Sequence, residues 1–305
     1  MSTLATESSF RKKLALWQHK YLSQHKIAGY LWSIVRAVLI FGISFIILYP
    51  VLVNFSTSIM SSRDLADVLV RWVPRYVSWG QIAENYRVTF IAMNYWEALK
   101  NSLILALMVS GLTVASCTVV GYGFARFNFP LKNFWFLMVL LTLLIPPQTI
   151  MISLFLNFRF FDFFGLLKEP INLIGTYWPF GLQAATAVGL KNGLFIFIAR
   201  QYFRGMPKQL EEAAYVDGAG ALKTFFTVML PGAGPILIII FLFSFVWQWN
   251  DVFWTSLYMR PSQALMPFVL QSMRGLPWSM ITPGYDVPWT VQENAGKLLF
   301  MAPLL

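Results

Sequence analysis

Long stretches without a single charged residue constrain this chain more than any other feature of its sequence. Leu, Ile, Val, Phe and Met dominate all five of them, which are Ala37–Ser62, Asn101–Ala125, Asn133–Phe158, Pro170–Leu190 and Thr224–Asn250. A helix needs about 20 mostly apolar residues to cross the roughly 30 Å hydrocarbon core of a bilayer. We therefore expect each stretch to form a membrane-spanning helix, which makes the chain an all-α integral membrane protein.

The composition of the whole chain agrees with that expectation. Hydrophobic residues make up 57% of the sequence and charged residues 12%, whereas ordinary soluble domains contain about 45–50% apolar and about 25% charged residues. These proportions argue against a soluble enzyme and against a disordered chain. The one cysteine, Cys117, lies inside the second uncharged stretch and has no partner for a disulfide within the chain.

The positive charge of the chain indicates how it sits in the membrane. Lys and Arg outnumber Asp and Glu by 23 to 13, and positive residues near span ends favour the cytoplasmic side. With the N-terminus in the cytoplasm, the inner segments carry 12 Lys and Arg against four Asp and Glu, and the outer segments carry 10 against nine. We therefore predict a cytoplasmic basic tail at residues 1–36 and attribute the surplus to membrane topology, not to nucleic-acid binding.

The remaining residues, 37–305, are predicted to form one transmembrane domain. Residues 63–97 are polar and aromatic enough to fold as a small outer cap over the second and third spans, and residues 251–294 form a second outer loop. After Lys297 the uncharged residues Leu298–Leu305 cover only part of a bilayer. We expect them to belong to a sixth span that is cut short; a short re-entrant helix is the alternative.

The most informative stretch is Met206–Pro231, between the fourth and fifth uncharged stretches. Pro207 suits a helix start, where a missing N–H costs nothing, and the residues from Gln209 to Ala214 all tolerate a helix. The series Asp217-Gly218-Ala219-Gly220 is typical of a turn. We predict a short cytoplasmic helix that is followed by a turn.

The spacing within this stretch resembles a known signature. Glu212-Ala213-Ala214, three residues, Gly218, nine residues and Val228-Met229-Leu230-Pro231 are similar to the EAA motif of permease subunits in ATP-binding-cassette (ABC) importers, with Val228 in place of the usual Ile. Further segments resemble the carbohydrate, maltose-importer-like branch of that family: Asn101-Ser102, Tyr122–Phe127, Ile145–Thr149 and Trp247–Asp251. The resemblance implies the six-helix type I ABC importer permease fold.

The resemblance also implies a role for the loop at residues 204–224. In such permeases a coupling helix docks in a cleft of a separate ATPase subunit and transmits its closure to the spans. The residues expected to couple in this way are Glu211, Glu212, Ala213, Ala214, Asp217 and Gly218. We expect the two glutamates to present negative charge to a basic groove, the alanines to allow close approach and the glycine to permit a sharp exit. A solvated amphipathic loop helix is the alternative.

The chain lacks residues for catalysis of its own. Gly218–Thr224 superficially resembles a phosphate loop, but Leu222 stands where such a loop needs a glycine before its lysine. The histidines, His19 and His25, lie in the basic tail, and no zinc, Ser-His-Asp or paired-carboxylate pattern is present. We expect a transport subunit and not an enzyme, with no catalytic residue, metal or cofactor of its own; ATP and Mg²⁺ would be bound by partner ATPase subunits.

Polar residues within the apolar stretches are candidates for a substrate pathway. Lys191 is the most unusual, because a charge inside a bilayer costs about 2.5–3.5 kcal/mol on insertion scales and usually faces a bundle interior. Its setting, Gly189-Leu190-Lys191-Asn192-Gly193, predicts a kinked or broken fourth helix. The predicted pathway residues are Lys191, Asn192, Gln248 and Asn250. A lysine that extends to the cytoplasmic headgroups is the alternative for the first of them.

The second outer loop carries aromatic residues that suit sugar stacking. In related sugar importers the corresponding loop of one permease subunit reaches toward the ligand cleft of the binding protein. Trp278, Tyr285 and Trp289 occupy this loop here. A structural lid is an equally good interpretation.

Together these features predict a permease subunit of an ATP-driven, binding-protein-dependent oligosaccharide importer in a bacterial inner membrane. The expected partners are a homologous second permease, an ATPase dimer, an extracytoplasmic or periplasmic substrate-binding protein, the sugar and membrane lipid. Lys191 and the outer arginines are compatible with an acidic, alginate-type substrate, and neutral oligosaccharides remain open. The alternatives are an ABC permease for a non-sugar solute and an ion-coupled secondary transporter, although the five stretches contain no Asp or Glu.

Overall fold

The computed structural model describes residues 24–70, 72–163, 165, 168–189, 191–260, 263–273 and 287–304. Within these ranges the chain is built from helices, and strand-type pairing is limited to an isolated antiparallel bridge between Phe161 and Ile171. The prediction of an all-α protein is confirmed.

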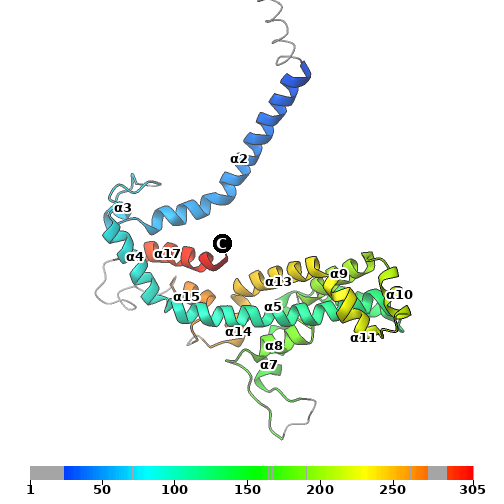
Figure 1. Ribbon diagram of the computed structural model, residues 1–305. Helices are drawn as coiled ribbons and strands as arrows, with labels where there is room; N and C mark the ends of the chain where they lie inside the picture. Colours follow the sequence, from blue (N-terminus) through cyan, green and yellow to red (C-terminus); the bar gives the residue numbers. More distant parts are fainter. Residues whose placement is uncertain are drawn as a thin grey trace, which may run out of the picture.

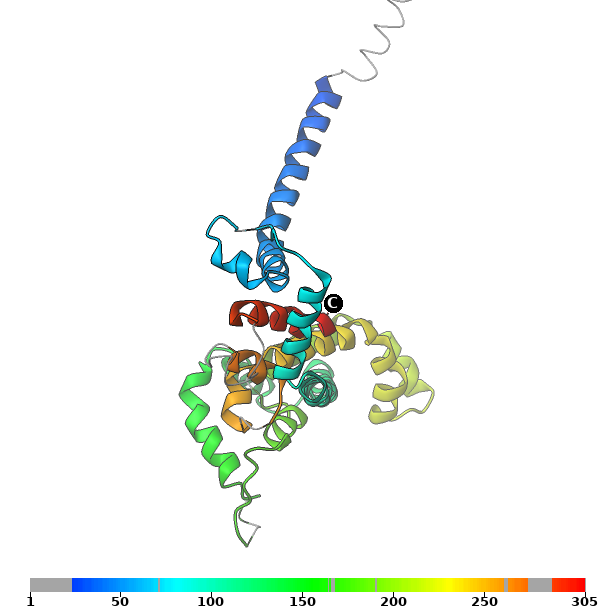
Figure 2. The same cartoon turned by 90° about the vertical axis from the view of Figure 1, so that its left-hand side faces the viewer.

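The first uncharged stretch lies in α2, Gln24–Ser58, a continuous helix of 35 residues. Its part from Gly29 to Ser58 is long and apolar enough to cross a membrane, and its most apolar window is 0% buried within the chain. In Figures 1 and 2, α2 rises away from the other helices and meets them only near its C-terminal end. Because α2 begins at Gln24, the predicted end of the basic tail at residue 36 falls inside this helix.

The second uncharged stretch lies in α5, Tyr95–Arg126, a helix of 32 residues that forms the centre of the fold (Figure 1). Three further helices pack along it: α8 (Trp178–Ala185), α9 (Asn192–Gly205) and α13 (Gly234–Trp249). The packing of α9 on α5 requires a glycine, since a Cβ on Gly121 would lie 2.5 Å from the Cβ of Ala199. Gly121 and Ala199 thus allow the backbones of α5 and α9 to approach closely, as small residues commonly do between membrane helices.

The third and fifth uncharged stretches are broken at proline and glycine, contrary to the prediction of single helices. The third forms α6 (Lys132–Leu141) and α7 (Pro147–Arg159), and the Pro-Pro pair between them lacks the N–H groups that would continue a helix. The fifth begins with α11 (Ala221–Thr224), a π-helical turn (Phe225–Met229) and α12 (Leu230–Gly232). It then bends by 76° into α13, around a Pro-Gly-Ala-Gly-Pro segment.

The fourth uncharged stretch is also not one helix. The residues before Trp178 are irregular, and the helical part consists of α8 and α9 with a break between Ala185 and Asn192, where Ala187 has a φ of 57°. The predicted break near Lys191 is therefore confirmed. Within the described residues, α2 and α5 qualify as spans by length and composition, and the bent pair that ends in α13 gives a third.

The outer segment folds around two buried polar side chains. It contains α3 (Ser62–Ala66) and α4 (Trp79–Ala92) and packs mainly on α2, on the start of α5 and on α17 (Trp289–Met301), not over the third span as expected. The carboxylate of Asp64 accepts backbone hydrogen bonds from Arg75 and Tyr76, at 3.0 and 3.2 Å. Asn85 donates to the backbone oxygens of Ser58 and Met60, at 3.0 and 3.1 Å.

The C-terminal part adds short helices beside the end of α13. These are α14 (Phe253–Tyr258), α15 (Met266–Ser272), α17 and a 3₁₀ turn (Ala302–Leu304). The last uncharged residues therefore continue a helix that begins at Trp289: Leu298–Met301 complete α17, and Ala302–Leu304 form the 3₁₀ turn. α17 packs on α2 and α4.

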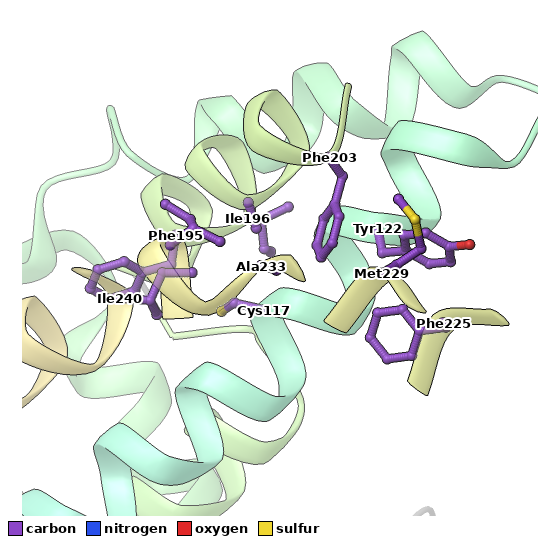
Figure 3. Close-up of a cluster of buried hydrophobic side chains, with 11 residues drawn as sticks. Cys117, Tyr122, Phe195, Ile196, Phe203, Phe225, Met229, Ala233 and Ile240 are labelled. Atoms are coloured by element: carbon purple, nitrogen blue, oxygen red, sulfur yellow. The ribbon is translucent and has the colours of Figure 1, made fainter. Parts of the chain in front are cut away.

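A buried apolar cluster fixes the far end of the bundle. It is drawn in Figure 3 and unites α5, α9, the π-helical turn and α13 through Cys117, Tyr122, Phe195, Ile196, Phe203, Phe225, Met229, Ala233 and Ile240. Tyr122 stands at the centre of its aromatic part, with ring centroids of Phe203 and Phe225 at 5.3 and 4.7 Å. This cluster anchors the segment that follows the predicted coupling loop onto the end of α5.

Candidate functional site

The predicted coupling loop forms a short helix and a tight turn at the far end of α5 (Figure 1). After α9 ends at Gly205, α10 runs over Gln209–Val216, and Gly218 follows with a φ of +79°. The N–H groups of Gly218 and Ala219 donate to the carbonyls of Tyr215 and Ala214, at 3.0 and 2.9 Å. This is a Schellman turn, which favours glycine at the left-handed position. The predicted helix and turn are both confirmed.

Glu211 is held inside the chain and not presented to a partner. Its carboxylate accepts a hydrogen bond of 2.9 Å from the Tyr122 hydroxyl and lies 3.3 Å from Nε of Arg126. Arg126 also donates from Nη2 to the backbone oxygen of Met206 at 2.8 Å. The side chains of Arg126 and Glu211 are 7% and 11% exposed. We refer to Tyr122, Arg126 and Glu211 as the α5–α10 clamp.

The expectation that Glu211 presents its charge to a partner is therefore wrong. Glu211 faces α5, where it contacts Tyr122 and Arg126, and Ala214, one turn on, is buried on the same side of α10, which packs on the π-helical turn. Glu212, Ala213 and Asp217 are exposed, as a docking surface requires.

Exposed apolar side chains lie beside these three residues. Val216 and Leu222 are 88% and 77% exposed, and Leu210 and Tyr215 are also exposed. Exposed apolar groups of this kind, rimmed by charge, are typical of a protein interaction site.

A second feature is a partly open cavity between α5, α8, α9, α13 and α14, with a volume of about 100 Å³, or about 630 Å³ when its open part is included. Its aromatic wall consists of Phe180, Phe195, Trp247, Trp254 and Tyr258. Its polar side chains are Thr113, Gln183, Lys191, Asn192, Ser244, Gln248 and Asp251. We refer to this space as the central cavity.

Lys191 lies at the mouth of the central cavity, at the break between α8 and α9. It is the residue before the first turn of α9, its side chain is exposed, and its Nζ lies 5.1 Å from the ring centroid of Trp247. From this point α9 continues for 14 residues, which is about 21 Å at 1.5 Å per residue. Lys191 is therefore far from the end of that helix, which disfavours the alternative that it extends to the headgroups there.

Charge and hydrogen-bonding groups in the cavity are incompletely paired. Asp251 accepts hydrogen bonds from the N–H and hydroxyl of Thr255, at 2.8 and 3.1 Å, and is attracted electrostatically by Lys191. Among the described residues no carboxylate lies within 4.0 Å of Lys191. The Nε2 of Gln248 is buried and makes no hydrogen bond. Buried polar groups are normally paired, so an unpaired one marks a place where a ligand or water binds.

Of the other predicted residues, some line the central cavity and others do not. Asn192 lines the cavity, but its amide donates to the backbone oxygen of Gln183 at 3.3 Å and so bridges the helix break. Asn250 lies outside the cavity and donates to the backbone oxygen of Val246 at 2.8 Å, because it follows the last turn of α13. Trp289 is 51% exposed at the start of α17 and does not line the cavity. Trp278 and Tyr285 lie outside the described residues.

Sequence reasoning did not select Asp251, Trp254 and Tyr258 as pathway residues. Asp251 is the last residue of Trp247–Asp251, the segment that resembles the carbohydrate branch, and it lies three positions after Gln248. Its nearness to Gln248 in the sequence could have indicated that it belongs to the pathway. Trp254 and Tyr258 follow at helical spacing on α14 and stack with centroids 5.7 Å apart. Their role depends on α14 folding back over α8, which no local pattern indicates.

Comparison with known proteins agrees with this architecture. Residues 117–301, more than half of the chain, match the family described as the binding-protein-dependent transport system inner membrane component. The osmoprotective compounds uptake permease protein GgtD of Synechocystis sp. is 30% identical over 81% of this chain and 81% of its own length. The arabinooligosaccharides transport system permease protein AraQ of Halalkalibacterium halodurans is 29% identical over 69% of this chain and 67% of its own length.

A solved structure shows the same fold. It is a chain from a bacterial ABC transporter involved in the import of the acidic polysaccharide alginate, with a TM-score of 0.73, 21% identity and coverage of 91% of this chain and 94% of that chain. The predicted type I ABC importer permease fold is thereby confirmed. The relatives are permeases, so the chain is a transport component and not an enzyme. It is a multi-pass protein of the inner membrane, and it belongs to the family of inner membrane components of binding-protein-dependent transport systems.

Proposed function

We propose that this chain carries oligosaccharides through the central cavity as one of two permease subunits of an ATP-driven importer. The observation that supports this most is the pairing of an aromatic wall with unpaired polar groups in one cavity. Aromatic faces such as Trp254 and Tyr258 stack on sugar rings, and sugar hydroxyls both donate and accept hydrogen bonds. Gln248 supplies a free donor and Asp251 an acceptor.

Lys191 favours an acidic sugar within that class. It is a cation at the cavity mouth that interacts electrostatically with Asp251 but has no carboxylate within 4.0 Å among the described residues, so it can form a direct ion pair with a uronate carboxylate. Charge-assisted hydrogen bonds of this type are roughly twice as strong as neutral ones. The named relatives for arabinooligosaccharides and alginate lend support to a sugar substrate.

The coupling loop is proposed to face the cytoplasm, with the N-terminus on the same side. The exposed face of α10, with Glu212, Ala213 and Val216, would dock on an ATPase dimer that binds ATP and Mg²⁺. The clamp would then carry the movement of α10 directly to α5, because a buried ion pair joins the two helices. A homologous second permease and an extracytoplasmic binding protein would complete the importer.

A non-sugar solute is the second candidate. The sn-glycerol-3-phosphate transport system permease protein UgpE of Yersinia enterocolitica is 26% identical over 88% of this chain, and its named substrate is a small phosphorylated solute. An anionic phosphate would also satisfy Lys191. The family excludes the other alternative, an ion-coupled secondary transporter.

Substrate-stimulated ATPase activity of the reconstituted importer tests this proposal. Acidic and neutral oligosaccharides and glycerol-3-phosphate are compared, each with its binding protein. We expect stimulation by oligosaccharides, greatest with uronate chains, and a decrease of about tenfold for the acidic ones in Lys191→Met, since hydrogen bonds to charged groups contribute about 1.5–3 kcal/mol. Arg63→Met, an exposed outer cation away from the cavity, is the matched control. Stimulation by glycerol-3-phosphate alone would show that the sugar assignment is wrong.

A further inference from the structure

A second pocket, at the end of α5, is strongly basic. It lies between the last turn of α5, the connection to α6 and the last turns of α9, with a volume of about 1370 Å³ including its open part. Its cations are Arg126, Lys132, Arg200, Arg204 and Lys208, and its lining contains no Asp or Glu. We refer to it as the basic pocket.

Most of these cations have no anionic partner. Arg126 is paired with Glu211 in the clamp, but among the described residues no carboxylate lies within 4.0 Å of Lys132, Arg200, Arg204 or Lys208. The guanidinium of Arg200 stacks on Phe136 at 3.9 Å, and its buried Nε makes no hydrogen bond. Like charges that line one pocket repel one another, so the pocket attracts an anion.

An apolar groove, of about 770 Å³ including its open part, continues from the basic pocket, and the two share Phe124 and Phe129 as walls. The groove runs between α6 and α9 toward the helix break. It is lined by Trp135, Met138, Val139, Val188, Ile196 and other mainly apolar residues. Trp135 and Val188 are 52% and 70% exposed, so nothing in the described chain fills it.

We propose that the basic pocket and the apolar groove together bind one anionic phospholipid, with its phosphate among the cations and an acyl chain along α6 and α9. Basic pockets between membrane helices are suited to anionic headgroups, because each Lys or Arg near the surface adds about 1 kcal/mol of attraction. A free phosphate or an acidic protein surface would use only the basic half. This site is independent of the sugar pathway, and only its assignment to the inner leaflet rests on the proposed orientation.

Lipids retained by the intact importer test the proposal. The complete transporter is reconstituted in phosphatidylcholine nanodiscs that contain phosphatidylglycerol, and native mass spectrometry counts the lipids kept after transfer to detergent. We expect phosphatidylglycerol to be enriched over phosphatidylcholine. The preference should fall about 25-fold in Lys132→Gln/Arg204→Gln, which is about fivefold for each charge removed.

Two matched controls test whether the loss of lipid is specific to this site. One removes charge elsewhere on the chain, and the other adds a large side chain elsewhere on the apolar surface. Arg36→Gln/Lys223→Gln removes two exposed cations on the same proposed side, outside the pocket, and should keep the preference. Val188→Trp fills the groove and should lower retention, whereas Val119→Trp, an exposed position on α5 outside the groove, should not.

Several results would overturn the proposal. These are equal retention of the two lipids, the same loss in the Arg36→Gln/Lys223→Gln control, or displacement by inorganic phosphate alone with no effect of Val188→Trp. Lipid enrichment seen only when the ATPase is removed would assign the basic pocket to the partner. Each result is read from bound lipid and is independent of whether sugars drive transport.

Discussion

The α5–α10 clamp and the central cavity both contain charged or polar groups, but these groups are paired in the clamp and incompletely paired in the cavity. In the clamp, the carboxylate of Glu211 contacts both Tyr122 and Arg126, at 2.9 and 3.3 Å. In the cavity, Lys191 has no carboxylate within 4.0 Å among the described residues, and Gln248 has a buried amide nitrogen with no hydrogen bond.

This difference separates structural groups from ligand-binding groups. A buried charge that has an opposite charge beside it is compensated within the chain, and removing its partner leaves an uncompensated charge. A polar group that folding leaves unpaired costs free energy and is retained where it binds something else. The clamp should therefore respond to mutation mainly in stability, and the cavity mainly in transport.

The largest expected effect is in the clamp. Arg126→Leu leaves Glu211 buried without its cation, which should destabilise the folded permease by about 3–5 kcal/mol. The melting temperature of the purified importer measures this. The double variant Arg126→Leu/Glu211→Leu should recover much of the loss, because it removes both charges. An unchanged melting temperature in Arg126→Leu would contradict the clamp.

The turn after α10 should show an effect on coupling. Gly218→Val forces a side chain into a φ of +79°, which costs roughly 1–2 kcal/mol, although nothing lies within 4 Å of its Cβ. We expect ATP hydrolysis that no longer drives uptake. Gly220→Val is the matched control, since Gly220 has a φ of −76° and equally open space. Equal coupling of ATP hydrolysis to uptake in both variants would show that the turn at Gly218 has no role in coupling.

The cavity should show the opposite pattern to the clamp. Gln248→Leu removes an unpaired buried amide, so the melting temperature should stay the same or rise while uptake falls severalfold. Gln263→Leu is the paired comparison, because its amide donates to the backbone oxygen of Gly175 at 2.8 Å. That variant should lose stability. A loss of stability in Gln248→Leu with normal uptake would break the distinction between the two regions.

The smallest effect concerns Asp64, a buried carboxylate with several hydrogen bonds just after the C-terminal end of α2. Burial alone would raise its pKa, but backbone N–H groups of Arg75, Ser61 and Tyr76 and the Ser61 hydroxyl outweigh it and hold the pKa below 3.8. A lowered pKa in the folded state gives stability that is present above the unfolded value and lost as the pH falls through the folded one.

Hydrogen-exchange protection of the Arg75 and Tyr76 amides measures this contribution. Protection should be constant near neutral pH and should decrease as the pH falls from about 4, near the unfolded pKa, through the lowered folded pKa, where the carboxylate is protonated. Asp64→Asn should lower protection at neutral pH as well. Asp67→Asn breaks an exposed ion pair with Arg75 and should have little effect. Full protection of both amides in Asp64→Asn would show that the carboxylate does not organise this loop.

Local sequence predicted the local features well. The helix α10 and the left-handed turn at Gly218 depend on a few neighbouring residues, and both are present as expected. The break before Lys191 was likewise predicted from the glycines around it. The uncharged stretches were less informative, since absence of charge does not distinguish a straight helix from one broken at Pro146-Pro147 or at Gly232–Gly234.

Local sequence patterns did not predict which side chains face the interior and which face outward. Glu211 and Glu212 are adjacent and chemically alike, yet one is buried against α5 and the other is exposed, because only the docking of α10 decides which side of the helix faces inward. Asn250 lies two residues from Gln248 and points elsewhere for the same reason.

The sequence by itself determined that the chain enters a membrane, that it breaks near Lys191 and that Gln209–Val216 forms a short helix with a turn at Gly218, since hydrophobicity and glycine positions act over short distances. Only the tertiary structure decided which charges are paired. Arg126 and Glu211, which form the clamp's ion pair, are 85 positions apart. Pairing at such separations depends on how α5, α9, α10 and α13 pack, and that packing buries the clamp and leaves the cavity and the basic pocket with unpaired groups.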